Sequence, residues 1–200
     1  SGLSGTANAA RLAAETLKEE FPNRKIIVID SLCASLGQGL LVDYALRMKD
    51  EGKSMEETAQ WVQDHLQNIC HLFTVDDLKY LQRGGRISKT TALLGTMIGI
   101  KPVLHVDEEG KLVPLSKVRG RKQSIQALVD KMEQNIGSYR SQKQPIFISH
   151  GDCEEDAKYL AGLVKERFGY DECLINIIGP TIGAHAGPGT LALFFLGDVR

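Results

Sequence analysis

Near its C-terminus the chain reads Ile178-Gly-Pro-Thr-Ile-Gly-Ala-His-Ala-Gly-Pro-Gly-Thr190. Two short apolar runs, Leu174–Ile178 and Leu191–Leu196, enter and leave this segment, and both are typical of buried strands. The segment between them is too rich in glycine and proline for an ordinary helix and too apolar for a solvated linker. Because glycine lets the backbone approach a ligand closely, we expect a shaped loop that places His185 at the edge of a sheet.

The composition is that of an ordinary globular chain. Its 200 residues are 42% hydrophobic and 24% charged, with a net charge of −1. The absence of a basic block argues against nucleic acid as a partner. No apolar run approaches the roughly 20 residues of a membrane span, and no signal peptide is visible. Four cysteines without CxxC spacing favour buried thiols in a reducing cytoplasm over a disulfide framework or a zinc site.

The chain from Cys70 onward alternates strands and helices. The apolar patterns predict strands at 71–75, 100–106, 111–118, 145–149, 174–178 and 191–196. The second and third strands form a hairpin, and Pro114 argues that the third lies at a sheet edge. The same patterns predict helices at about 121–137 and 153–168, the latter capped by Asp152, and another helix that carries Leu93, Leu94 and Met97.

The first 70 residues predict a different unit. A helix with Ser4 or Thr6 at its N-cap is followed by a buried parallel strand, Lys25–Asp30, and by helices at about 35–51 and 54–69. The last of these helices starts with Ser54 and Glu57, which have the spacing of a capping box. A lone strand cannot form a sheet, and the opening Gly/Ser turn has no strand before it. We therefore expect two α/β units, 1–70 and 71–200, with the first part of the first unit missing from this chain.

Three motifs are candidates for chemistry. The stretch Ser1-Gly-Leu-Ser-Gly-Thr6 places hydroxyls and free backbone amides at a helix N-terminus, which favours an anion. The alternative is a capped turn without a ligand. Arg86, on a Gly-rich bend, can bind a carboxylate or phosphate with its fork of donors, or else cap carbonyls or pair with Asp76 or Asp77.

His185 is the third candidate, because a neutral imidazole can donate one N–H to a carboxylate, although it could equally be a structural histidine. His150 follows a predicted strand and is a weaker candidate of the same kind. We assign no role to the other histidines, His65, His71 and His105. No close cluster of His, Asp and Glu predicts a metal site.

Together these motifs resemble the DegV family of bacterial lipid-binding proteins. The matching stretches are Ser1-Gly-Leu-Ser-Gly-Thr6, Val28-Ile-Asp-Ser31, Thr74–Ser88, Gly99-Ile-Lys-Pro102, His150-Gly-Asp152 and Ile178–Gly189. The resemblance implies a two-domain α/β fold. One domain would have three layers, α/β/α, around a parallel sheet and is incomplete here. The other would have two layers, α/β, with a mixed six-stranded sheet.

The resemblance also implies a function. Such a protein binds one long-chain fatty acid between its domains and is the acyl-binding subunit of a bacterial fatty acid kinase, with no catalytic residues or cofactor of its own. A separate ATP-dependent kinase subunit phosphorylates the carboxylate, and the acyl phosphate goes on to phospholipid synthesis, with transient contact at the membrane surface. By the resemblance, Ser4, Thr6 and His185 hydrogen-bond the carboxylate, while Arg86 lies near the head group or faces the partner.

The apolar tail of such a ligand needs a channel, since each buried methylene contributes ~0.8 kcal/mol. Candidates for its lining, which could equally be ordinary core, are Leu93, Met97, Leu191 and Phe194. Two enzymatic alternatives stay open: a hydrolase with Ser4 as nucleophile and His185 as base, and a substrate-binding subunit like those of dihydroxyacetone kinases. The hydrolase lacks an identifiable third partner to orient the base.

Overall fold

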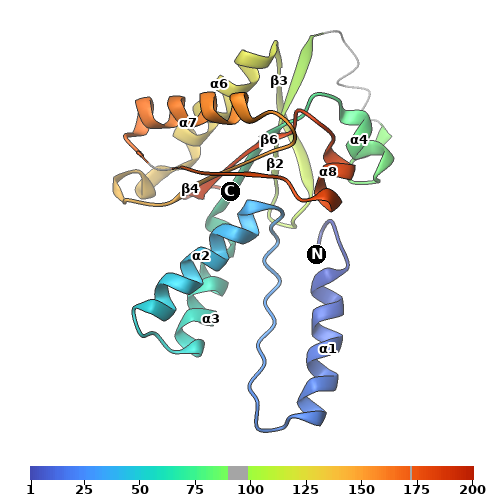
Figure 1. The fold of residues 1–200 in the computed structure, drawn as a ribbon, viewed down its shortest axis with the longest axis vertical. Coiled ribbons are helices and arrows are strands. Elements are labelled where there is room, and N and C mark those ends of the chain that lie inside the picture. The colour runs from blue at the N-terminus through green and yellow to red at the C-terminus, as the bar shows by residue number, and fades with distance from the viewer. Residues whose placement is uncertain (90–98, 172) are drawn as a thin grey trace.

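A computed structural model describes residues 1–89, 99–171 and 173–200 (Figure 1). Its described part holds one six-stranded sheet in the order β3-β2-β1-β6-β4-β5. The strands are β1 (Ile69–Thr74), β2 (Ile100–Val106), β3 (Leu112–Arg119), β4 (Ile146–His150), β5 (Cys173–Ile177) and β6 (Leu191–Leu196). Only β4 and β5 pair in parallel. The predicted mixed six-stranded sheet is confirmed, as are the β2–β3 hairpin and the edge position of β3, which carries Pro114.

One face of the sheet is covered by two long helices. These are α6 (Arg121–Asn135) and α7 (Glu154–Phe168), which lie side by side over the sheet in Figure 1. Side chains alternate between the faces of a strand. In β6, therefore, Leu191, Leu193 and Phe195 point to this side and join its closed apolar core.

The opposite face of the sheet packs against α2 (Leu36–Asp50), which contacts β1, β4 and β6. Ala192, Phe194 and Leu196 of β6 belong to the core on this side. The remaining elements are α1 (Thr6–Glu20), α3 (Met55–Asp64), η1 (Leu66–Asn68), α4 (Leu78–Arg83), η2 (Gly137–Ser141) and α8 (Pro180–Ala186). In Figure 1, α1 lies on the same side of the sheet as α2 and α3.

Residues 21–35 contradict the predicted strand Lys25–Asp30. The segment is extended but irregular between α1 and α2, and none of the six strands of the described chain pairs with it. A strand needs a hydrogen-bonded neighbour to be a strand, and the β-branched run has none here. The domain division near residue 70 stays a prediction, and α2 of the first predicted unit packs directly on the sheet of the second.

Three local predictions also need correction. The segment 179–190 is not all loop, because α8 occupies its first half. Proline is favourable at the first position of a helix, and Gly187, with φ of 82°, ends this one. The N-cap of α7 is Cys153, not Asp152, whose φ is 55°. The N-cap of α1 is Gly5, not Ser4 or Thr6.

The capping box of Ser54 and Glu57 at α3 is confirmed. The helix predicted around Leu93 lies outside the described residues.

Candidate functional site

A cavity of about 380 Å³ lies on the α2 side of the sheet. Its floor includes Phe73 of β1 and Ala192 and Phe194 of β6, which occupy neighbouring positions on that face. Its walls come from the loop Ser1–Thr6, the segment before α2, the end of α4 and helix α8. The cavity therefore brings together Ser4, Thr6, Arg86 and His185, all of which line it, from regions far apart in sequence.

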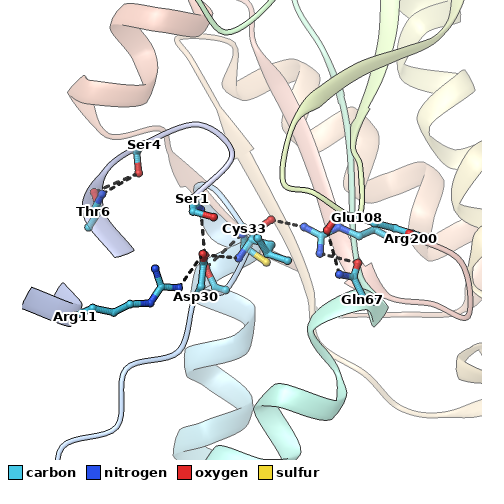
Figure 2. Close-up of polar contacts among 11 residues, drawn as sticks. Ser1, Ser4, Thr6, Arg11, Asp30, Cys33, Gln67, Glu108 and Arg200 are labelled. Atoms are coloured by element: carbon cyan, nitrogen blue, oxygen red, sulfur yellow. Dashed lines mark hydrogen bonds and ion pairs between the residues drawn. The ribbon is translucent and has the colours of Figure 1, made fainter. Parts of the chain in front are cut away.

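The hydroxyls of Ser4 and Thr6 line the cavity at the N-terminal end of α1. Ser4 Oγ donates to Thr6 Oγ1 at 3.3 Å and accepts the Thr6 N–H at 3.4 Å, as Figure 2 shows. Both residues are exposed, so their hydroxyls can turn toward a ligand. The N-cap residue Gly5 offers no side-chain cap to α1. The first amides of a helix have no intrahelical acceptor, so they add positive potential at this place.

His185 is fixed by close packing. It lies in the last turn of α8, and α8 packs against α4. A Cβ added to Gly84, at the end of α4, would lie only 2.1 Å from His185 Nδ1. The imidazole therefore rests directly on the backbone of Gly84, where no larger residue leaves room for it.

Arg86 joins the two sides of the entrance. Its Nε donates to the Leu3 carbonyl at 3.1 Å, and its guanidinium also donates to the Gly84 carbonyl. Arg86 does not pair with Asp76 or Asp77, which was the alternative prediction. Asp76 pairs with Lys101 at 2.7 Å, and Asp77 caps α4 by accepting the Lys79 N–H at 2.9 Å. Arg86 thus holds the Ser1–Thr6 loop beside the residues that support His185.

The segment before α2 forms a further wall and is anchored by two charged residues (Figure 2). Asp30 accepts the Leu32 N–H at 3.3 Å and pairs with Arg11 at 3.3 Å. Burial raises the pKa of Asp30, but hydrogen bonds from Ser1 and the Leu32 backbone outweigh it and bring the pKa down to about 2. Asp30 therefore stays ionised.

Arg200 is the second anchor. It is buried and donates to the backbone carbonyls of Leu32, of Leu66 at 2.9 Å and of Val106 at 3.3 Å. These carbonyls belong to the segment before α2, to η1 and to the end of β2. One guanidinium thus connects the cavity wall to two neighbouring elements.

The predicted tail residues divide into three groups. Phe194 lines the cavity. Leu191 does not, because alternation along β6 points it to the opposite face, where it packs in the core under α6 and α7. Its assignment to the channel was wrong. Leu93 and Met97 lie outside the described residues. His150 is also buried away from the cavity lining, and its Nδ1 accepts the Cys153 N–H at 3.3 Å.

Sequence reasoning missed several polar residues in the cavity, among them Ser35, Ser149 and His71. Ser35 Oγ donates to Ser149 Oγ at 3.1 Å across 114 positions of sequence, and both residues line the cavity. His71 of β1 lines it as well and is only 2% exposed. The signal available was the alternation within β1, which places His71 on the same face as Phe73.

The described residues contain neither a metal-binding cluster nor a membrane-spanning helix. No group of three or more His, Cys, Asp or Glu residues there is arranged to hold a metal ion. Within the same ranges, no helix has the length and apolar content needed to cross a membrane.

Solved structures share this fold. A DegV family protein from Eubacterium eligens, loaded with heptadecanoic acid, superposes with a TM-score of 0.91 at 25% identity, over 99% of this chain and 70% of that one. The Streptococcus pneumoniae Fatty Acid Kinase (Fak) B3 protein, loaded with linoleic acid, gives a TM-score of 0.89 at 28% identity, over 98% and 68%.

Sequence relatives agree with the structural ones. A DegV domain-containing protein of Clostridium perfringens is 46% identical over 100% of this chain and 68% of its own length. One from Lactococcus lactis is 40% identical over 97% of this chain and 66% of its own length. The chain thus spans about two thirds of these relatives. The family model of the DegV proteins matches residues 1–198, and the chain accordingly belongs to the DegV family.

Proposed function

We propose that this protein binds a long-chain fatty acid, with the carboxylate at Ser4, Thr6 and His185 and the tail in the cavity over the sheet. The observation that carries the proposal is the cavity itself, in which these three side chains meet an apolar floor of Phe73, Ala192 and Phe194. Similar proteins from Eubacterium eligens and Streptococcus pneumoniae are loaded with fatty acids.

The physical chemistry of the cavity suits such a ligand. Each methylene removed from water contributes ~0.8 kcal/mol, so the tail supplies most of the affinity. The carboxylate needs donors, and the hydroxyls of Ser4 and Thr6, the imidazole of His185 and the N-terminal end of α1 all border the cavity. The Arg86 guanidinium donates hydrogen bonds to the Leu3 and Gly84 carbonyls, so we assign it to shaping the entrance and adding positive charge.

We infer a carrier rather than an enzyme. The hydroxyl of Ser4 donates to Thr6, not to the imidazole that would have to activate it as a nucleophile. Cys33 also lines the cavity, but burial raises the pKa of its thiol to about 11, and a protonated thiol is a poor nucleophile.

The carrier would present its fatty acid to an ATP-dependent kinase subunit in the cytoplasm, for conversion to acyl phosphate and then phospholipid. The similarity to the Streptococcus pneumoniae kinase protein supports this step. In the proposed arrangement the carboxylate lies at Ser4 and Thr6, which are exposed, and the tail lies inside the cavity, so a partner could reach the reactive end.

Native mass spectrometry and lipid extraction of the purified protein test the binding step. We expect one fatty acid per chain, and a protein that stays empty when offered stearic acid would contradict the proposal. Ser4→Ala should weaken binding about tenfold, because it removes a hydrogen bond to a charged group. Ser141→Ala, which alters an exposed hydroxyl of η2 outside the cavity, is the matched control and should bind normally.

The kinase step needs a separate assay. The loaded protein, incubated with a purified fatty acid kinase subunit and ATP, should yield acyl phosphate, and without that subunit it should yield none. Hydrolysis of model esters that disappears in Ser4→Ala would instead favour the hydrolase.

A further inference from the structure

One histidine in the cavity has no explanation in the binding of a carboxylate and an apolar tail. His71 lies in the middle of β1, paired with Phe194 of β6, and is 2% exposed. The rings of His71 and Phe194 meet edge to face, with centroids 5.5 Å apart. Its Nε2 edge lies against Gly37 in the first turn of α2, where an added Cβ would come within 2.1 Å of Nε2. His71 is therefore held in place by apolar and backbone atoms.

Neither ring nitrogen of His71 has a hydrogen-bond partner among the described residues. The Ile69 backbone is near enough to raise the pKa of His71, but it makes no hydrogen bond of acceptable geometry. Burial, the first cause, and the charge of Arg200 prevail and lower the pKa to about 3. The ring is neutral at physiological pH, so it offers one donor and one acceptor. An unpaired buried polar group is costly, and those that persist usually serve a purpose.

The position of His71 along the cavity is set by β6. Thr190, whose hydroxyl donates to the Gly187 carbonyl just after α8, lines the cavity, and Phe194, the partner of His71, lines it four residues further along the chain. Four residues of extended chain span roughly 13 Å. His71 thus lies well away from the carboxylate site, beside the part of the cavity that the interior of an acyl chain would occupy.

We propose that His71 recognises an oxygen substituent, above all a hydroxyl, on an interior carbon of the bound acyl chain. This inference rests on the proposed fatty acid function and names its substrate class, a mid-chain hydroxy fatty acid. A hydroxyl can donate or accept, so it can pair with one ring nitrogen of a neutral imidazole whether that nitrogen carries the proton or not. An unsubstituted chain leaves both nitrogens unpaired, and a site built for a hydroxyl discriminates against the analogue that lacks it.

Competition binding with three ligands tests this proposal: stearic acid, a stearic acid hydroxylated near its middle, and one hydroxylated next to the carboxylate. The protein should bind the mid-chain hydroxy acid at least about fivefold more tightly than stearic acid, as expected for one net hydrogen bond. The hydroxyl next to the carboxylate should bring no such gain. His71→Phe should remove the preference, so that the mid-chain hydroxy acid and stearic acid compete equally for this variant.

His105→Phe is the matched control. His105 lies on β2 opposite Leu72, on the other face of the sheet and outside the cavity lining, so the preference should survive this change. Equal affinity for all three ligands would overturn the proposal, since it would mean that a water molecule satisfies His71. A preference that persists in His71→Phe would also overturn it. Both results leave ordinary fatty acid binding intact, whereas failure to bind even stearic acid would overturn the proposed function as well. The comparison of ligands in the unmodified protein keeps the test valid if His71→Phe folds poorly.

Discussion

At the scale of single residues, Gly84 leaves the space that the imidazole of His185 needs, although it has no side chain to bind a ligand itself. Its backbone is in an ordinary helical conformation, with φ of −74°, so alanine would suffer no backbone strain there. The nearest obstacle to a side chain is the imidazole of His185, whose Nδ1 would lie 2.1 Å from an added Cβ. Glycine at this position is required by space and not by dihedral freedom.

The change Gly84→Ala should therefore displace His185. We expect the affinity for fatty acid to fall about tenfold or more, because the hydrogen bond from the imidazole to the carboxylate is lost. Titration calorimetry against Gly162→Ala, where an added Cβ meets nothing within 4 Å, measures the effect. Unchanged affinity in Gly84→Ala would show that His185 does not hold the carboxylate.

His71 should make the stability of the fold depend on pH. Its pKa is lowered from 6.5 to about 3 by burial, so below pH 6.5 the unfolded chain binds a proton that the folded chain does not. The contribution is complete above the unfolded pKa and is lost as pH falls toward the folded one. Between pH 7 and pH 5 it should cost about 2 kcal/mol of unfolding free energy.

Urea unfolding of the parent protein and His71→Phe at both pH values measures this loss. The variant should lose about 2 kcal/mol less than the parent over that interval. Parallel pH dependence in the two proteins would mean that His71 is protonated in the folded state.

Single residues also show what the sequence can predict about a site. Ser4, Arg86 and His185 stood out because each lies beside glycines, and glycine-rich bends bring a backbone close to a ligand. His71 had no such neighbourhood. Its strand was predictable, but whether its face meets a solid core or a cavity depends on α2 and β6, which pack there from elsewhere in the chain.

At the scale of elements, α8 is the instructive case. Four glycines and two prolines in the segment 178–190 argued for a loop, yet residues 180–186 form a helix. Proline occupies the first turn, where its missing N–H has no consequence, and α4 packs along the helix. The packing of α4 against α8 outweighs the poor helix propensity of Gly183, and this packing cannot be predicted from the local sequence. At α3, by contrast, the Ser54 and Glu57 capping box is wholly local and was predicted correctly.

Helix α7 offers a test of propensity alone. Gly162 is exposed in the middle of this helix, and a side chain there meets open space. Gly162→Ala should raise the unfolding free energy by about 0.5 to 1 kcal/mol, because glycine loses more backbone freedom than alanine on folding. Chemical denaturation measures the gain, and a loss of stability would mean that α7 packs against something at this position.

At the scale of the whole molecule, the sheet joins regions that no sequence window contains together. The strands themselves were predicted from their apolar patterns, and the mixed six-stranded sheet followed from the family resemblance. The order of the strands and the Ser35–Ser149 hydrogen bond depend on pairings across more than a hundred residues. The strand predicted at Lys25–Asp30 fails for a related reason, since strand propensity has no effect without a neighbouring strand.

Arg200 should influence both stability and binding, because it connects the cavity wall to η1 and β2. Arg200→Met leaves three buried or half-buried backbone carbonyls without their donor, and we expect the unfolding free energy to fall by about 2 to 3 kcal/mol. Fatty acid binding should weaken as the segment around Leu32 loosens. The control is Arg47→Met, which breaks an exposed pair with Asp43 and should cost less than about 1 kcal/mol. Equal losses in the two variants, measured by denaturation, would contradict this role of Arg200.

The two faces of β6 have one more consequence. On the side of α6 and α7, the residues of β6 pack in an apolar core made of protein side chains. On the side of α2, Ala192 and Phe194 border a cavity of about 380 Å³. A lipid tail in that cavity replaces missing interior atoms, so loading should slow local opening on one side of the sheet only. Amide hydrogen exchange should therefore slow in α2 when fatty acid binds, while exchange in α6 and α7 stays at its unloaded rate. The bound lipid would then form a removable part of the apolar interior on the α2 side of the sheet.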